Sequence, residues 1–67
     1  MENLKQIRKS LGLSQMDLAQ KVGVSLLTIQ LWERGVSQPN ESNKEELHRV
    51  IAELQKGAKN DGTSGRN

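Results

Sequence analysis

Apolar residues recur every three or four positions along most of this chain, which is the spacing of one face of an α-helix. Leu4, Ile7 and Leu11 follow this spacing and predict a first helix over residues 2–11, which Gly12 is expected to end. No segment of the sequence alternates strictly between apolar and polar residues, as a half-buried β-strand would. The pattern therefore predicts an all-α fold.

A second helix is predicted over about residues 15–22. Ser14 is a favourable N-cap, and Asp17 three residues later completes a capping box, in which each side chain bonds the backbone N–H of the other residue. Gly23 stands where this helix must stop, because glycine takes the left-handed conformation after a helix without a Cβ penalty.

A third helix is predicted over about residues 26–34, with Ser25 as its N-cap and Gly35 directly after its end. Ile29 and Trp32 lie three residues apart and are expected to face the core. A lone tryptophan can also stack on a nucleobase, as in proteins that bind single strands. The inward position of Trp32 favours the core instead.

A fourth helix is predicted over about residues 43–56, after a loop that contains Pro39. Ser42 and Glu45 are expected to form its capping box, and Gly57 is expected to end it. Its apolar residues lie at positions i, i+3, i+4 and i+7, which places them on one face: Leu47, Val50, Ile51 and Leu54.

The candidate core consists of fifteen apolar residues. They are Leu4, Ile7, Leu11, Leu13, Met16, Leu18, Ala19, Val22, Val24, Ile29, Trp32, Leu47, Val50, Ile51 and Leu54. This set suffices for one compact domain, which is predicted over residues 1–56 as a bundle of four short helices, or five. Residues 57–67 lack apolar periodicity and are predicted to form a disordered tail.

The composition excludes several classes of protein. The 67 residues include no cysteine and one histidine, so the fold must be held by packing, without disulfide bonds or a structural metal. The sequence also has no glycine-rich phosphate loop and no nucleophile elbow. A chain this small leaves no volume for an ordinary substrate pocket. No enzymatic activity, cofactor, metal or small-molecule substrate is therefore expected.

The net charge of +2 is unevenly spread. Residues 1–35 carry five basic and three acidic side chains, whereas residues 36–56 carry three basic and four acidic ones. This excess mildly favours a polyanion as the partner of the first half, although a mixed solvated surface explains it equally well. The N-terminus has no long apolar run, so neither a signal peptide nor a membrane span is predicted, and a cytoplasmic protein is expected.

The segment from Gln15 to Arg34 fits a helix-turn-helix, in which two short helices meet at a steep angle across a tight turn. Ala19 is small enough to let the second of these helices approach the first closely. The longer run from Leu4 to Gly35 resembles the Cro/repressor-type helix-turn-helix of lambdoid phages and related bacterial regulators. The matching pieces are Ile7-Arg8, Leu11, Gly12-Leu13-Ser14-Gln15, Asp17-Leu18-Ala19, Val22-Gly23-Val24-Ser25, Ile29, Trp32-Glu33-Arg34-Gly35 and Pro39.

This resemblance implies a nucleoid-associated transcription regulator, preferably a repressor, of bacterial or phage origin. It implies that the protein binds a double-stranded operator as a homodimer. By position, Arg8 and Glu33 match a structural ion pair, and Gln15 matches a residue that bonds a phosphate and braces the recognition helix. The base-reading surface matches Leu26, Leu27, Gln30 and Leu31. Contacts to phosphates are expected from Gln15, Ser25, Thr28, Arg34, Ser37, Gln38 and Asn40.

The expected reading face carries one amide and three leucines, where members of the family often carry polar residues. In one interpretation, the leucines contact thymine methyl groups and Gln30 bonds N6 and N7 of adenine, which predicts a palindromic, A·T-containing operator. In another, Leu26, Leu27 and Leu31 bind a protein, and the chain is an interaction module such as an antitoxin-like or polymerase-contacting partner. In a third, the C-terminal tail partly covers this face. The residues alone leave all three open.

Overall fold

Four helices follow one another in the computed structural model, which describes the backbone of residues 3–64 and the side chains of residues 3–56. They are α1 (Leu4–Ser10), α2 (Gln15–Val22), α3 (Leu26–Arg34) and α4 (Glu41–Ser64). The described residues contain no strand and no fifth helix. The predicted all-α fold is therefore confirmed, in its four-helix form.

α2 and α3 have the predicted bounds, because their end signals are local. The Ser14 Oγ accepts a hydrogen bond from the Asp17 backbone N–H at 2.9 Å, and the Asp17 carboxylate accepts one from the Ser14 N–H at 3.0 Å. At the start of α3, the Ser25 Oγ accepts from the Thr28 N–H at 3.1 Å. Gly23 follows α2 with a φ of 86°, the left-handed region that favours glycine.

α1 is shorter than the predicted helix over residues 2–11. Asn3 lies before it in the left-handed region with a φ of 66°, and Leu11 follows it as the C-cap. Asparagine tolerates this conformation better than most residues with a side chain. A helix cannot continue through a left-handed residue, so α1 begins at Leu4.

α4 begins two residues before its predicted start, and the predicted capping box of Ser42 and Glu45 is wrong. The cap is Asn40, whose side-chain oxygen accepts from the Asn43 backbone N–H at 2.8 Å. The Asn40 carbonyl also accepts from the Lys44 N–H at 2.8 Å. Asparagine is among the best N-cap residues, so the earlier of the two competing caps is the one used.

The prediction that Gly57 ends α4 is also wrong, since helical backbone continues to Ser64. Glycine inside a helix costs about 1 kcal/mol relative to alanine, but it keeps its backbone hydrogen bonds and does not by itself stop a helix. The division of the chain into a domain over residues 1–56 and a tail over 57–67 stays a prediction. Residues 65–67 lie outside the described residues.

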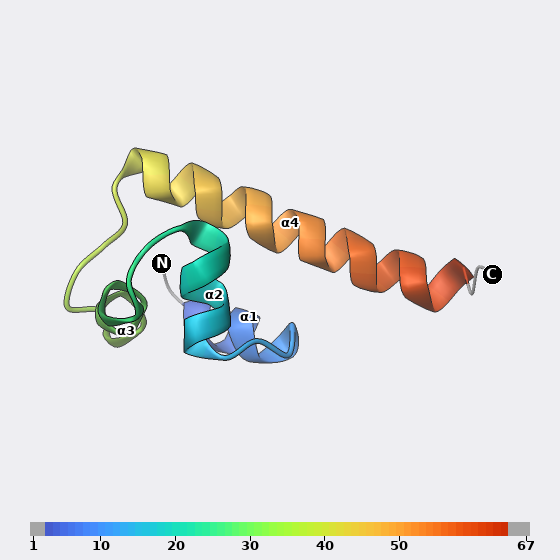
Figure 1. Ribbon diagram of the computed structural model, residues 1–67, viewed down its shortest axis with the longest axis horizontal. Coiled ribbons are helices and arrows are strands. Elements are labelled where there is room, and N and C mark those ends of the chain that lie inside the picture. Colours follow the sequence, from blue (N-terminus) through green and yellow to red (C-terminus); the bar gives the residue numbers. More distant parts are fainter. Residues whose placement is uncertain (1–2, 65–67) are drawn as a thin grey trace.

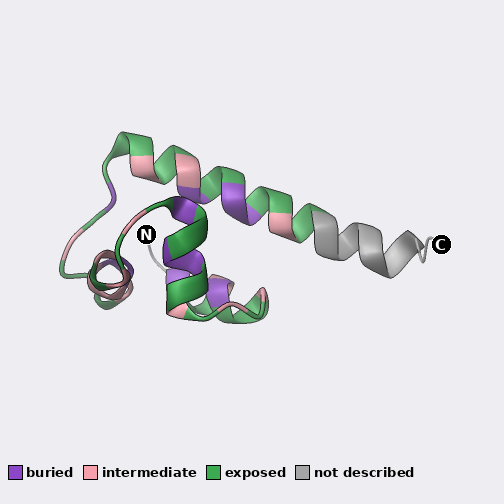
Figure 2. Ribbon diagram, viewed as in Figure 1, coloured by how far each residue is buried: buried purple, intermediate pink, exposed green. Residues whose placement is uncertain are grey.

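The helices pack around α2, which contacts both α3 and α4, while α1 packs against α3. Figure 1 views α3 nearly along its axis while α2 lies in the plane of the picture, so these two helices cross at a steep angle. In Figure 2, buried residues gather on α2 and on the part of α4 that passes over it. The buried core consists of Leu4, Leu18, Ala19, Val22, Ile29, Trp32, Leu47, Val50 and Ile51.

Five other candidate core residues are partly buried against this cluster: Ile7, Leu11, Leu13, Val24 and Leu54. The exception is Met16, whose predicted place in the core is wrong because 47% of it is exposed. Met16 is the second residue of α2, and its neighbours in the sequence explain its direction. The buried positions of this helix, Leu18, Ala19 and Val22, define a face that residue 16 does not share.

Candidate nucleic-acid interface

α3 is held to the rest of the molecule by two residues on its inner side. Ile29 is 0% exposed and Trp32 is 4% exposed, and both belong to the core cluster. On the other side, Leu27 is 60% exposed. The rest of the expected reading face is half-buried: Leu26, Gln30 and Leu31. The inner anchors thus leave one apolar patch with a single amide facing outwards.

The end of α4 does not cover this face. Figure 1 shows α4 running away from α3, with the C-terminal part of the helix at the opposite end of the molecule. The helical backbone of residues 57–64 therefore lies away from α3. The interpretation in which the tail covers the leucines receives no support from the described residues.

The start of α3 is built from two hydroxyl side chains. The Ser25 Oγ accepts from the Thr28 backbone N–H and also shares a hydrogen bond of 2.9 Å with the Thr28 hydroxyl. Both residues were expected to contact phosphates, and both are engaged here in the cap. The first backbone N–H groups of a helix lack partners within the helix, and they favour an anion.

Arg8 and Glu33 meet as the resemblance implies. The Arg8 Nε lies 2.6 Å from one carboxylate oxygen of Glu33, and its Nη2 lies 3.2 Å from the other. The Arg8 Nη1 donates to the carbonyl oxygen of Leu13 at 2.8 Å. The two side chains are only 9% and 3% exposed. This pair fixes α1 to the end of α3 and to the segment before α2.

Opposing influences act on the pKa of Glu33. Burial is the largest single influence and raises that pKa, because it disfavours the charged carboxylate. Hydrogen bonds from Arg8 and Gln15 favour the charged form, as do the positive charges of Arg8 and Lys5. The net result is that the pKa of Glu33 lies below its ordinary value. The hydrogen bond to Glu33 likewise raises the pKa of Arg8. Both groups are therefore charged in the folded protein at neutral pH.

Gln15 connects this ion pair to the outward face of α3. Its Nε2 donates to the Glu33 carboxylate at 3.0 Å, and its Oε1 accepts from the Gln30 Nε2 at 3.4 Å. The resemblance implied that Gln15 braces the recognition helix. The sequence did not predict that Gln15 bonds Gln30. This contact depends on how α2 crosses α3 and on side-chain rotamers, and the spacing of residues reveals neither.

The remaining expected phosphate contacts lie along and after the end of α3. Arg34 is its exposed last residue, and Gln38 is exposed in the following loop. Ser37 is half-buried in the same loop. Asn40 is exposed, and its side-chain oxygen is engaged in capping α4. These positions follow one another in the sequence from the end of α3 to the start of α4.

A family model described as helix-turn-helix matches residues 4–51, which covers α1 to α3 and the first half of α4. The chain belongs to the Cro/repressor-type helix-turn-helix family. Comparisons with curated proteins and with solved structures found no significant match. Family membership makes the protein a DNA-binding regulator whose ligand is double-stranded DNA.

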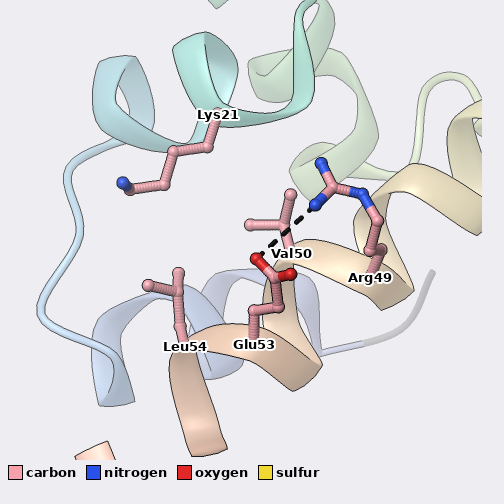
Figure 3. A pocket seen from close by; sticks show the side chains of 5 residues that line it. All are labelled: Lys21, Arg49, Val50, Glu53 and Leu54. Carbon is pink, nitrogen blue, oxygen red and sulfur yellow. Dashed lines mark ion pairs between the residues drawn. The ribbon is translucent and has the colours of Figure 1, made fainter. Parts of the chain in front are cut away.

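A pocket of about 170 Å³ lies between α2 and α4 of this helix-turn-helix protein (Figure 3). It is lined by Lys21 from α2 and by Arg49, Val50, Glu53 and Leu54 from α4. Arg49 bridges Glu53, at 3.5 Å, and Glu46. Small-molecule sites usually measure roughly 300–1,000 Å³. The face of α3, and not this pocket, is therefore the candidate site.

The described residues contain no group of three or more histidine, cysteine, aspartate or glutamate side chains that could hold a metal ion. None of the described helices combines the length and the apolar character that crossing a membrane requires.

Proposed function

We propose that this protein is a transcriptional repressor that inserts α3 into the major groove of a specific operator. The observation that carries this proposal is the two-sided character of α3. Ile29 and Trp32 fix one side in the core, while Leu27 and its neighbours are directed outwards. In helix-turn-helix proteins the second helix lies in the major groove in this way, and the first crosses the backbone.

The chemistry of the outward face favours A·T base pairs. The methyl group of thymine offers the apolar contact that Leu26, Leu27 and Leu31 need. An amide such as that of Gln30 pairs with N6 and N7 of adenine, and a good bidentate contact is worth ~1–3 kcal/mol of discrimination. We therefore propose an A·T-containing half-site.

Contacts to the DNA backbone would position α3 without reading sequence. We propose that they come from Gln15, Ser25, Thr28, Arg34, Ser37, Gln38 and Asn40. Most of these side chains are neutral, so the electrostatic contribution to affinity is small. One subunit alone would bind weakly, and we propose that a homodimer binds a palindrome with half-sites ~34 Å apart, one turn of DNA.

The decisive experiment is selection of bound sites from a random duplex library at physiological salt. We expect an enriched palindrome that contains A·T pairs. No enrichment from protein shown to be folded by circular dichroism would contradict the proposal. The same result would favour the second candidate function below.

Matched variants then test which residues read the sequence. Leu27→Ala and Gln30→Ala are each expected to weaken binding to the selected site by roughly 5- to 150-fold, with binding to unrelated duplexes nearly unchanged. Gln55→Ala is the control for Gln30→Ala, because Gln55 is an exposed amide on α4. It is expected to leave specific binding unchanged.

The exposure of Leu27 also favours a second candidate function, in which the same face binds a protein. In that case the chain acts as an antitoxin-like or polymerase-contacting module through Leu26, Leu27 and Leu31. Leu27→Ala would then abolish a protein complex and leave DNA binding intact. Under either proposal the protein works in the bacterial or phage-infected cytoplasm, associated with the nucleoid, and has no enzymatic role.

A further inference from the structure

Four polar side chains form one line from the interior of the domain to the outward face of α3. Arg8 donates to Glu33, Gln15 donates to Glu33, and Gln30 donates to Gln15. The line begins at the Glu33 carboxylate, which is 3% exposed. An ionised carboxylate accepts hydrogen bonds and donates none. Every partner of Glu33 must therefore turn a donor towards it.

This requirement fixes the direction of the Gln15 amide. Its NH₂ group must face Glu33, at 3.0 Å, because the amide oxygen would repel the carboxylate. The Gln15 Oε1 then faces away from Glu33, towards Gln30 on the same helix as Glu33, where it can only accept. The assignment of the two amide ends follows from the chemistry of Glu33 and does not depend on telling oxygen from nitrogen.

The same reasoning passes to Gln30. Its Nε2 lies 3.4 Å from the Gln15 Oε1, so its NH₂ group is turned towards Gln15. A primary amide carries two N–H donors on nitrogen and its acceptor on the other end. One N–H of Gln30 is used, and its Oε1 and second N–H are left for a ligand.

We infer that Gln15 is a positioning residue that fixes which end of the Gln30 amide meets a DNA base, and thereby selects adenine over guanine. Adenine presents the N6 amino donor and the N7 acceptor, which match the Oε1 and the second N–H of Gln30. Guanine presents two acceptors, O6 and N7, in the same place. A Gln30 amide free to rotate could turn its NH₂ group outwards and accommodate guanine. The inference rests on the proposed function, in which α3 reads the major groove.

The variant that tests this inference is Gln15→Lys. An ammonium group has three donors and no acceptor, so Lys at position 15 can still donate to Glu33 but cannot accept from Gln30. Gln30 must then turn its Oε1 inwards and its NH₂ group towards the DNA. We expect the preference at one base pair of each half-site to change from adenine to guanine, by roughly 5- to 150-fold.

The matched control is Met16→Lys. It adds the same charge at the neighbouring position of α2, and Met16 is 47% exposed and outside the line of hydrogen bonds. Added charge strengthens binding to all duplexes through phosphates. Met16→Lys is therefore expected to raise affinity without changing base preference, which separates the effect of charge from that of amide direction.

The probe is the random duplex library, applied to the wild type, Gln30→Ala, Gln15→Lys and Met16→Lys. If the wild type selects no site, or Gln30→Ala selects the wild-type site at every base pair, the proposed function of Gln30 fails and the inference fails with it. If Gln30→Ala loses the preference at one base pair and folded Gln15→Lys keeps adenine there, the inference alone is overturned.

A second variant keeps the test decisive if Gln15→Lys does not fold. Gln15→Met removes both the donor and the acceptor, so the Gln30 amide becomes free to rotate. We expect guanine to be tolerated at that base pair as well as adenine. A preference for adenine equal to that of the wild type would overturn the inference.

The free protein gives a readout that needs no DNA. In nuclear magnetic resonance spectra, the two side-chain N–H protons of Gln30 are expected to differ in temperature dependence, because one of them is hydrogen-bonded to Gln15. In Gln15→Met this difference should vanish. Equal behaviour of the two protons in the wild type would overturn the inference whatever the function of α3.

Discussion

At the scale of single residues, Arg8 joins three separate parts of the chain. It bonds Glu33 at the end of α3 and the carbonyl of Leu13 before α2, from its place in α1. Burying two charges away from water costs desolvation free energy, which offsets much of their mutual attraction. The pair therefore need not stabilise the fold in net terms. Removal of one partner is different, because it leaves the other charge buried and unpaired.

Arg8→Met is therefore expected to lower the free energy of unfolding by about 3–5 kcal/mol, measured by urea denaturation. The matched control is Arg49→Met. Arg49 also pairs with two carboxylates, those of Glu46 and Glu53, but on the exposed surface of α4. Exposed pairs contribute little, so no resolvable change is expected for the control. Equal effects of the two variants would contradict the structural role of the buried pair.

The lowered pKa of Glu33 makes stability dependent on acid pH. In the unfolded chain a glutamate titrates near pH 4.3, and in the fold it titrates lower. The stabilising contribution of its charged form is therefore complete above about pH 4.3 and is lost as the pH falls through the folded pKa. The wild-type free energy of unfolding should fall as the pH is lowered from about 5 to 3.

Glu33→Gln separates this contribution from that of other acids. The hydrogen bonds with Ser14 lower the pKa of Asp17, and a hydrogen bond from Arg49 lowers that of Glu46, so some acid dependence remains. We expect a shallower decline in Glu33→Gln than in the wild type, measured by urea denaturation at each pH. Parallel curves would mean that the fold does not lower the pKa of Glu33.

At the scale of the helix, short elements are held by packing and delimited by caps. α2 has eight residues and α3 has nine, which is too short for either to be stable alone in water. The caps decide where each helix begins, and the core residues decide that it forms at all. Loss of a cap therefore weakens the fold without abolishing it.

The competition between Asn40 and Ser42 at the start of α4 can be measured directly. Asn40→Ala removes the side-chain oxygen that accepts from the Asn43 N–H and is expected to lower stability by ~0.5–2 kcal/mol. Ser42→Ala lies on the exposed first turn and is expected to change stability by less than about 0.5 kcal/mol. Thermal denaturation of both variants checks the order. The reverse order would place the cap at Ser42.

A capping residue predicts where a helix begins or ends when no competing cap stands nearby. The bounds of α2 and α3 were predictable because a serine and a glycine flank each helix with no competitor nearby. The start of α4 was not, because two good caps stand two residues apart. Its end was not, because Gly57 lowers helix propensity without requiring a left-handed turn.

The candidate site was also predictable only in part. The inward positions of Ile29 and Trp32 follow from periodicity, and the meeting of Arg8 with Glu33 follows from the family resemblance. The contact between Gln15 and Gln30 joins residues fifteen positions apart on different helices. It depends on how α2 crosses α3, a property of packing that no local pattern encodes.

At the scale of the whole molecule, charge limits how the protein can bind DNA. A net charge of +2 on 67 residues gives little overall attraction to phosphates. If about four phosphates are neutralised, the logarithm of the binding constant should fall with the logarithm of salt concentration with a slope of roughly −3.6. Under the proposed function, affinity then comes largely from the outward face of α3 and from the proposed homodimer.

Arg34→Gln tests this account of charge. Arg34 is the exposed last residue of α3, and its replacement should reduce the magnitude of the salt slope by about 0.9 for each subunit on the DNA, or about 1.8 for the proposed homodimer. The preferred operator should stay the same. An unchanged slope, measured by fluorescence anisotropy at several salt concentrations, would show that Arg34 does not contact a phosphate.

The burial of Trp32 also makes the protein its own optical probe. It is the only aromatic residue among Trp, Tyr and Phe in the chain, and it lies in α3 with 4% of its surface exposed. Intrinsic emission therefore comes from one place, the buried inner side of α3. Undocking of α3 would expose the indole to water and shift its emission to longer wavelengths. For any variant of the outward face of α3 that loses DNA binding, the emission of Trp32 shows, without a label, whether α3 still packs against the core.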